Sequence, residues 1–74
     1  MFEWDENKRR KNRERRGLDF EDVDVLFAGR PLVTALSPRH DENRFVSTGE
    51  MDGKFYTVVW TWRGENQRII SFRR

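Results

Sequence analysis

Residues 54–73 read KFYTVVWTWRGENQRIISFR, and this stretch decides the fold. Aromatic and β-branched residues fill both of its arms, and such residues fit a pleated, half-buried strand surface. Gly64, Glu65 and Asn66 interrupt the pattern and supply a turn, so the stretch is predicted to form a β-hairpin. Because apolar residues fall on both faces, the hairpin should lie in the middle of a sheet, with one face on helices and the other towards a cleft or a partner.

The register of this hairpin follows from its turn if both strands are regular. Pairing Trp62 with Gln67 gives two further pairs, namely Trp60 with Ile69 and Val58 with Ser71. The opposite face is then expected to carry Phe55, Val59, Ile70 and Phe72. The last three of these residues are predicted to be core.

The composition indicates a folded protein despite its high charge. The chain has 74 residues, of which 38% are charged and 14% aromatic. We expect a single domain over residues 1–74, because ten aromatic side chains argue for a real core. The absence of cysteine excludes disulfides and thiolate metal sites. No apolar run approaches the roughly 20 residues of a membrane span, and a cytoplasmic protein is expected.

The formal net charge is only +2, but the charges are segregated along the chain. Residues 1–16 hold seven basic and four acidic side chains, whereas residues 17–29 hold four acidic and no basic ones. Residues 54–74 hold five basic side chains and one acidic one. The first basic segment has two interpretations: a solvated helix, or a face that attracts phosphates or an acidic partner.

The rest of the chain predicts two helices and three more strands. A helix over residues 6–16 is expected between Asp5, a plausible N-cap, and Gly17, which ends it. A second, core-facing helix is indicated by the helical spacing of Phe20, Val23, Leu26 and Phe27. Residues 2–4, 32–37 and 45–48 are β-prone, and Asp52-Gly53 indicates a tight turn before the hairpin. The predicted order is βααββββ, an α+β fold with two N-terminal helices packed on one face of a small, mainly antiparallel sheet.

Few residues in the chain could carry chemistry. The one histidine, His40, lies beside Asp41 and Glu42 between two predicted strands. If the strand begins at Glu42, the side chains of His40 and Glu42 point to the same side, and an imidazole beside a carboxylate can move protons near neutral pH. A merely charged loop is the competing interpretation. One histidine with scattered acids lacks the ligand clustering of a zinc site, so neither a metal nor a cofactor is expected.

Arginine and tryptophan are the other candidates. An arginine fork binds phosphate and stabilises charge that develops on it. An unpaired base could stack on Trp4, Trp60 or Trp62, although Trp60 is expected to be core.

Two groups of motifs, in order along the chain, carry a family resemblance. The N-terminal group is Phe2-Glu3-Trp4-Asp5, Lys11-Asn12, Arg16-Gly17, Phe20-Glu21, Arg39-His40-Asp41, Glu42 and Arg44. The C-terminal group is Thr61, Arg63-Gly64, Arg68-Ile69-Ile70-Ser71 and Arg73. Together they resemble the BrnT toxin family, with Arg16 standing where members commonly have histidine. The resemblance implies a metal-independent ribonuclease toxin with a RelE-like fold, which cuts RNA, inhibits translation and is neutralised by a BrnA-like antitoxin in a hetero-oligomer.

The resemblance also implies the residues of the site. The catalytic group is His40, Glu42, Arg63, Arg68 and Arg73. The RNA-binding group is Trp4, Lys8 and Arg44, joined by Arg9 and Lys11 from the basic helix. The implied reaction is attack of a ribose 2′-hydroxyl on the adjacent phosphate: Glu42 or His40 takes the proton, the arginines hold the phosphorane charge, and an arginine or His40 assists the leaving oxygen.

Two questions stay open at the level of sequence. Arg68 and Arg73 differ in parity, so they share a face only if a bulge or the strand end intervenes. The alternative function is a noncatalytic nucleic-acid-binding or protein-interaction module on the same fold.

Overall fold

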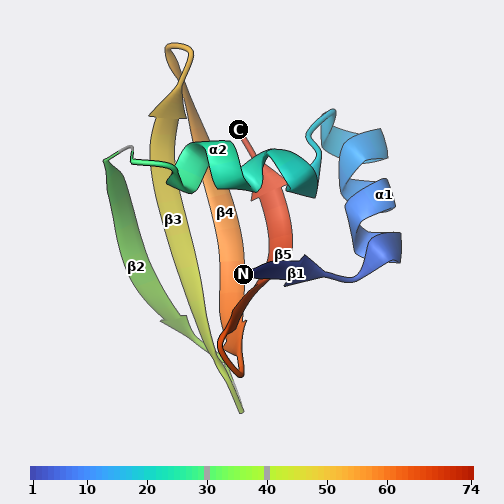
Figure 1. The fold of residues 1–74 in the computed structure, drawn as a ribbon, viewed down its shortest axis with the longest axis vertical. Helices are drawn as coiled ribbons and strands as arrows, with labels where there is room; N and C mark the ends of the chain where they lie inside the picture. The colour runs from blue at the N-terminus through green and yellow to red at the C-terminus, as the bar shows by residue number, and fades with distance from the viewer. Residues whose placement is uncertain (30, 40) are drawn as a thin grey trace.

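The computed structural model describes residues 1–29, 31–39 and 41–74. Its elements are β1 (Phe2–Trp4), α1 (Glu6–Arg16), the 3-10 helix η1 (Phe20–Asp22), α2 (Val23–Phe27), β2 (Leu32–Pro38), β3 (Asn43–Met51), β4 (Lys54–Arg63) and β5 (Asn66–Arg73). The order of helices and strands is the predicted one, and the α+β class is confirmed. Figure 1 shows α2 crossing in front of the sheet, with α1 beside it.

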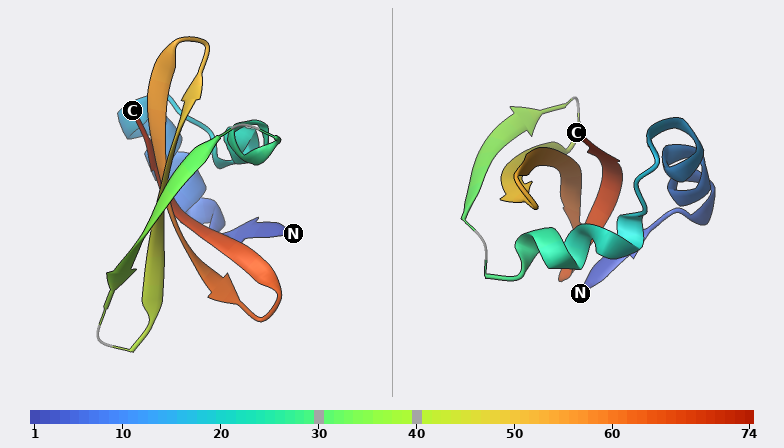
Figure 2. Two further views of the ribbon diagram at one scale, coloured as in Figure 1. Left: turned by 90° about the vertical axis from the view of Figure 1, so that its left-hand side faces the viewer. Right: turned by 90° about the horizontal axis from the view of Figure 1, so that it is seen from above.

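The five strands form one sheet in the order β1-β5-β4-β3-β2. Strands β2 to β5 are antiparallel neighbours, and β1 is added in parallel to β5 at the edge. The predicted hairpin is β4 with β5, and β4 is the central strand. The turn between β3 and β4 has positive φ at Asp52 (54°) and Gly53 (77°), as a two-residue hairpin turn requires. Figure 2 shows how strongly the sheet twists.

A bulge changes the predicted register of the hairpin. Trp62 pairs with Gln67 and Trp60 with Ile69, as expected, but Val58 pairs with Phe72 and not with Ser71. Ile70 is the extra residue and has no partner in β4. A regular register would point Ser71 into the core and Phe72 outwards. Burying the phenylalanine instead favours the bulge by about 2 kcal/mol.

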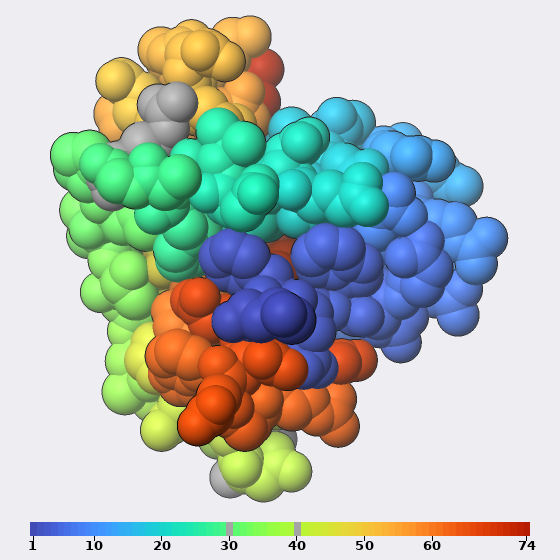
Figure 3. Space-filling view, in the orientation of Figure 1, coloured from blue at the N-terminus to red at the C-terminus, as the bar shows by residue number. Residues whose placement is uncertain are grey.

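The hydrophobic core therefore lies between the sheet and the segment η1–α2. Its buried members are Phe20, Val23, Leu26, Val58, Trp60, Ile69 and Phe72. The predicted core role of Phe72 is confirmed, whereas Val59 and Ile70 lie half-buried on the other face of the sheet. We call that other face, which α2 does not cover, the open face. The space-filling view in Figure 3 shows the covered face, with α2 lying over the sheet.

Trp60 anchors the centre of this core. Its ring stacks on Phe45 with centroids 4.6 Å apart, and its indole N–H donates to Ser47 Oγ at 2.9 Å. Ser47 is fully buried, so the pair satisfies two polar groups inside the core.

Helix α1 has the predicted bounds and caps. The Asp5 carboxylate accepts from the backbone N–H groups of Asn7 and Lys8 at 2.8 and 3.3 Å, and Gly17 ends the helix with φ of 70°. The helix contains no apolar residue, so it cannot pack by an ordinary hydrophobic stripe.

One buried amide attaches α1 to the sheet. Asn12 Nδ2 donates to the carbonyls of Phe72 (2.9 Å) and Leu18 (3.0 Å), and Asn12 Oδ1 accepts from the Phe72 N–H at 3.2 Å. Strand β1 pairs with β5 only over residues 67–69, so these bonds replace the strand pairing that β1 does not supply at Phe72. The expectation that both helices pack on one face is therefore wrong for α1, which lies beside the β5 edge (Figure 1).

Candidate functional site

A pocket of about 260 Å³ opens on the open face, where α1, the start of β3 and the β4–β5 hairpin meet. It is lined by Lys8, Glu42, Arg44, Thr61, Trp62, Arg63, Arg68 and Ile70. Five of these are residues that the family resemblance implied: Lys8, Glu42, Arg44, Arg63 and Arg68. The structure thus brings together residues from three separate parts of the chain, and we call this cavity the arginine pocket.

The sheet register places these side chains in one row. Arg68 pairs with Thr61 on β4 and with Glu3 on β1. On β3, Arg44 precedes Phe45, which pairs with Trp60 on β4. Arg44 is therefore level with Thr61, on the side of β4 away from β5. Paired residues of neighbouring strands point to the same face, so the row runs from Arg44 through Thr61 and Arg68 to Glu3 across the open face.

Ion pairs fix the orientation of two arginines. Arg44 Nε donates to Glu42 Oε2 at 2.8 Å, and Arg68 Nη1 donates to Glu3 Oε2 at 2.8 Å. Glu3 Oε1 also accepts from Asn66 Nδ2 at 3.0 Å. The hydrogen bond from Arg68, followed by that from Asn66, holds the pKa of Glu3 below its ordinary value, so its carboxylate stays ionised beside Arg68.

The pocket remains positively charged after this pairing. Its lining contains four cations and one carboxylate, and Glu3 lies behind Arg68. Among the described residues, neither Lys8 nor Arg63 has a carboxylate oxygen within 4.0 Å. These two side chains are available to an anion, and a phosphate is the anion that arginine forks and a lysine ammonium suit best.

Trp62 borders the pocket, but it lies two residues along β4 from the core residue Trp60, so its side chain points to the covered face. It contacts Trp60 edge-on, with ring centroids 5.2 Å apart, and 54% of its surface is exposed. The indole is therefore on the opposite side of β4 from Thr61, Arg63 and the partner strand's Arg68.

The bulge at Ile70 sets the direction of Arg73. Arg68 pairs with Thr61 and Arg73 with Thr57, and these threonines are four residues apart on β4, so both arginines point to the open face. The parity difference seen in the sequence is thus resolved by the bulge. Arg73 nevertheless lies about 13 Å along the strand from Arg68 and does not line the arginine pocket.

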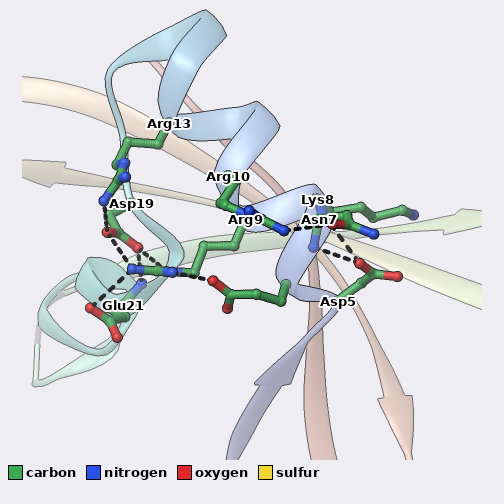
Figure 4. Close-up of polar contacts among 9 residues, drawn as sticks. Asp5, Asn7, Lys8, Arg9, Arg10, Arg13, Asp19 and Glu21 are labelled. Carbon is green, nitrogen blue, oxygen red and sulfur yellow. Dashed lines mark hydrogen bonds and ion pairs between the residues drawn. The ribbon is translucent and has the colours of Figure 1, made fainter.

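Arg9 is held in a cluster of carboxylates. Its guanidinium contacts Glu6, Asp19 at 2.9 Å and Glu21 at 3.6 Å, and its side chain is only 17% exposed (Figure 4). The N–H of Glu21 and then the Arg9 side chain hold the pKa of Asp19 below its ordinary value. The cluster ties α1 to η1, so a structural role accounts for Arg9.

The remaining predicted residues lie apart from the pocket. Trp4 is half-buried against the core, 6.3 Å from the Phe20 ring, and its partner Ile69 points to the covered face. Lys11 lies on α1 beside a neighbouring pocket described below. His40 lies outside the described residues, so its position relative to Glu42 is not part of this site.

Sequence reasoning did not assign Glu3 or Thr61 to the site. Trp62, one of three tryptophans predicted as stacking candidates, borders the pocket but points to the covered face. The signal for Glu3 is its parallel pairing with Arg68. The sequence does not reveal this pairing, because an edge strand of three residues does not specify its register.

Two absences hold for the part of the chain that the structure describes. No group of three or more His, Asp or Glu side chains there is placed to hold a metal ion. No helix in the same residues has the length and apolarity to cross a bilayer.

The fold and the basic pocket define a small α+β protein with a cationic cavity on one face of its sheet. Residues 4–74 match the family model described as ribonuclease toxin, BrnT, of type II toxin-antitoxin system. The chain therefore belongs to the BrnT family of ribonuclease toxins, a family of type II systems in which the toxin has an antitoxin protein as partner. No curated protein matches the chain significantly.

Proposed function

We propose that this protein is an endoribonuclease toxin that cleaves RNA at the arginine pocket without a metal ion. The observation that carries the proposal is the convergence of Lys8, Arg44, Arg63 and Arg68 around the carboxylate of Glu42 in one open cavity. Four cations can bind the scissile phosphate and stabilise the charge of the transition state. One carboxylate among them can accept a proton.

The proposed reaction is an internal transesterification. Glu42 accepts the proton of a ribose 2′-hydroxyl, whose oxygen attacks the adjacent phosphorus. Arg63 and Arg68 stabilise the phosphorane oxygens, and the bond from phosphorus to the 5′ oxygen breaks. That oxygen takes a proton from Lys8 or from His40. The products are a 2′,3′-cyclic phosphate and a 5′-hydroxyl.

The wider role follows from the family. We propose a RelE-like toxin that acts in the cytoplasm, inhibits translation by cutting RNA and is neutralised by a BrnA-like antitoxin in a hetero-oligomer. Family membership and the pocket support this role. Induced expression with and without the neighbouring gene, scored for growth arrest and RNA decay, tests it directly.

Cleavage in vitro tests the chemistry. Purified protein is incubated with RNA in EDTA, and fragment ends are assayed for 2′,3′-cyclic phosphate. Arg63→Ala and Arg68→Ala should each lower the rate roughly 100-fold, by analogy with the loss of one transition-state donor. Lys54→Ala, an exposed lysine at the β3–β4 turn, is the matched control and should cleave normally. Unchanged cleavage by both arginine variants would contradict the assignment.

A noncatalytic interaction module is the second candidate. It is favoured by an apolar pocket of about 450 Å³ on the β2–β3 side, beside exposed Val33 (77%) and Phe55 (66%). Large apolar side chains left in solvent are typical of surfaces that bind another protein. RNA binding without any fragments in the EDTA assay, together with a normal complex with the antitoxin, would favour this function.

A further inference from the structure

A second cavity adjoins the arginine pocket. It has a volume of about 230 Å³ and lies between α1 and β5, lined by Lys8, Lys11, Asn12, Arg15, Arg16, Ile70 and Ser71. Lys8 and Ile70 line both cavities, so the two share a wall. We call the second cavity the helix pocket.

The helix pocket contains positive charge and no acid. Its lining includes four cations, and no carboxylate contributes to it. Within residues 1–29, 31–39 and 41–74, no ion pair involves Lys11, Arg15 or Arg16. Like charges held this close repel one another, and a bound anion would relieve that repulsion.

Helix geometry explains why these cations share one side. Positions 8, 11, 12, 15 and 16 follow the spacing that in ordinary surface helices carries the apolar stripe. Here the stripe consists of cations around a single buried residue, Asn12. The cations thus occupy the helix positions that usually carry apolar side chains facing a core.

The Asn12 amide fixes the rotation of this stripe. The Asn12 side chain is hydrogen-bonded to both backbone groups of Phe72. Helix α1 therefore cannot rotate to carry Lys8 or Lys11 away from β5 without breaking these buried bonds. The Arg9 cluster ties the adjoining flank of the helix to η1. The cationic stripe is therefore held in place before any ligand arrives, which lowers the entropic cost of binding.

We propose that the helix pocket is a second phosphate-binding site for the substrate, which is single-stranded RNA running from the arginine pocket along α1. This inference rests on the proposed function, because the scissile phosphate is placed in the arginine pocket. Lys8 stands between the two sites and contacts the backbone linking them, while Ile70 offers an apolar contact to the ribose or base at the shared wall. Two small adjoining cavities suit successive backbone positions of a flexible strand.

The test compares two variants that lose the same charge. The first is Lys11→Gln/Arg15→Gln/Arg16→Gln, and the second is Arg10→Gln/Lys54→Gln/Arg74→Gln, whose residues are exposed and line neither pocket. Binding of a 2′-O-methyl RNA oligonucleotide, which cannot be cleaved, is measured over a range of salt concentrations. For single strands the slope of log K against log salt is negative, and its magnitude decreases by about 0.7 for each phosphate that the protein no longer neutralises. We expect a fall of at least that size in the first variant and little change in the control.

A cleavage measurement separates this inference from the proposed function. A dinucleoside monophosphate has one phosphate and fills only the arginine pocket, so the first variant should cleave it like the wild type while its KM for longer RNA rises. If no RNA is cleaved at all, the proposed function fails but the salt slope still tests the second site. Equal salt slopes for both variants would overturn the inference. So would a first variant that binds RNA normally but no longer binds the antitoxin, because the pocket would then serve the protein partner.

Discussion

Asn12→Ala would test the view that one amide holds the basic helix on the sheet. The substitution removes three hydrogen bonds, to the carbonyls of Leu18 and Phe72 and from the Phe72 N–H. It leaves both backbone groups of Phe72 without a partner, and that residue is 0% exposed. Each unsatisfied buried group costs about 1–3 kcal/mol, so we expect a loss of about 3 kcal/mol in the free energy of unfolding.

This loss is large for a chain of 74 residues, whose total stability should be about 4–11 kcal/mol. The corresponding fall in Tm is about 12–24 °C, taking about 4–8 °C for each kcal/mol in a domain of this size. Urea unfolding followed by tryptophan fluorescence measures the free energy, and thermal unfolding followed by circular dichroism measures Tm.

Asn7→Ala is the matched control for this measurement. Asn7 lies exposed on the same helix, and its side chain only accepts from Arg10 at 2.9 Å. Both variants gain the same helix propensity, so the difference between them isolates the buried bonds. An Asn12→Ala protein that unfolds within about 0.5 kcal/mol of Asn7→Ala, the range of an ordinary surface change, would refute the reasoning.

Two further predictions concern carboxylates that pair with arginine. The pKa of Asp19 is lower in the folded protein than its ordinary value of 3.8, so the stability it contributes is present above that pH and is lost as the pH falls through the folded pKa. Asp19→Asn should therefore be less stable at neutral pH and lose less stability on acidification below about pH 3.8; parallel acid-unfolding curves for the variant and the wild type would contradict this. Glu3→Gln should lower the KM for RNA, because a negative charge beside the phosphate site is gone, and also lower kcat, because Arg68 loses the partner that orients it at 2.8 Å. Steady-state kinetics at fixed ionic strength measure both, with Glu65→Gln at the β4–β5 turn as control, and an unchanged kcat would show that Glu3 does not position Arg68.

Local patterns predicted much of the fold correctly. Asp5 and Gly17 bound α1 because capping depends on residues within a few positions of the helix end. The β4–β5 hairpin and the Asp52-Gly53 turn followed from residue type in the same way. These features depend on neighbours in sequence, which a single chain displays directly.

The register of β5 and the position of α1 depend on distant partners. Nothing in Ile69-Ile70-Ser71 marks which residue is skipped, and the bulge follows from the better burial of Phe72 against the helix layer. The attachment of α1 depends on an amide whose partner is 60 residues away. A helix without apolar residues gave no sign of which side would face the sheet.

The site could be predicted only in part, for the same reasons. Lys8, Glu42, Arg44, Arg63 and Arg68 meet in the arginine pocket, and their roles in RNA cleavage stay a prediction. Arg9 was predicted to bind RNA because it lies in a run of basic residues, whereas the structure pairs it with carboxylates. Its carboxylate partners Asp19 and Glu21 lie beyond the end of α1, and only the turn at Gly17 brings them near.

The unpaired residue at Ile70 makes the spacing between Arg68 and Arg73 as informative as the arginines themselves. Deletion of this residue would leave a spacing of four, and a regular strand would then keep both guanidiniums on the open face with the same threonine partners. A spacing of five keeps them on one face only if the strand holds a bulge. In comparing related chains, a spacing of five between these arginines therefore indicates a bulged strand, and a spacing of four indicates a regular strand with the same cationic face.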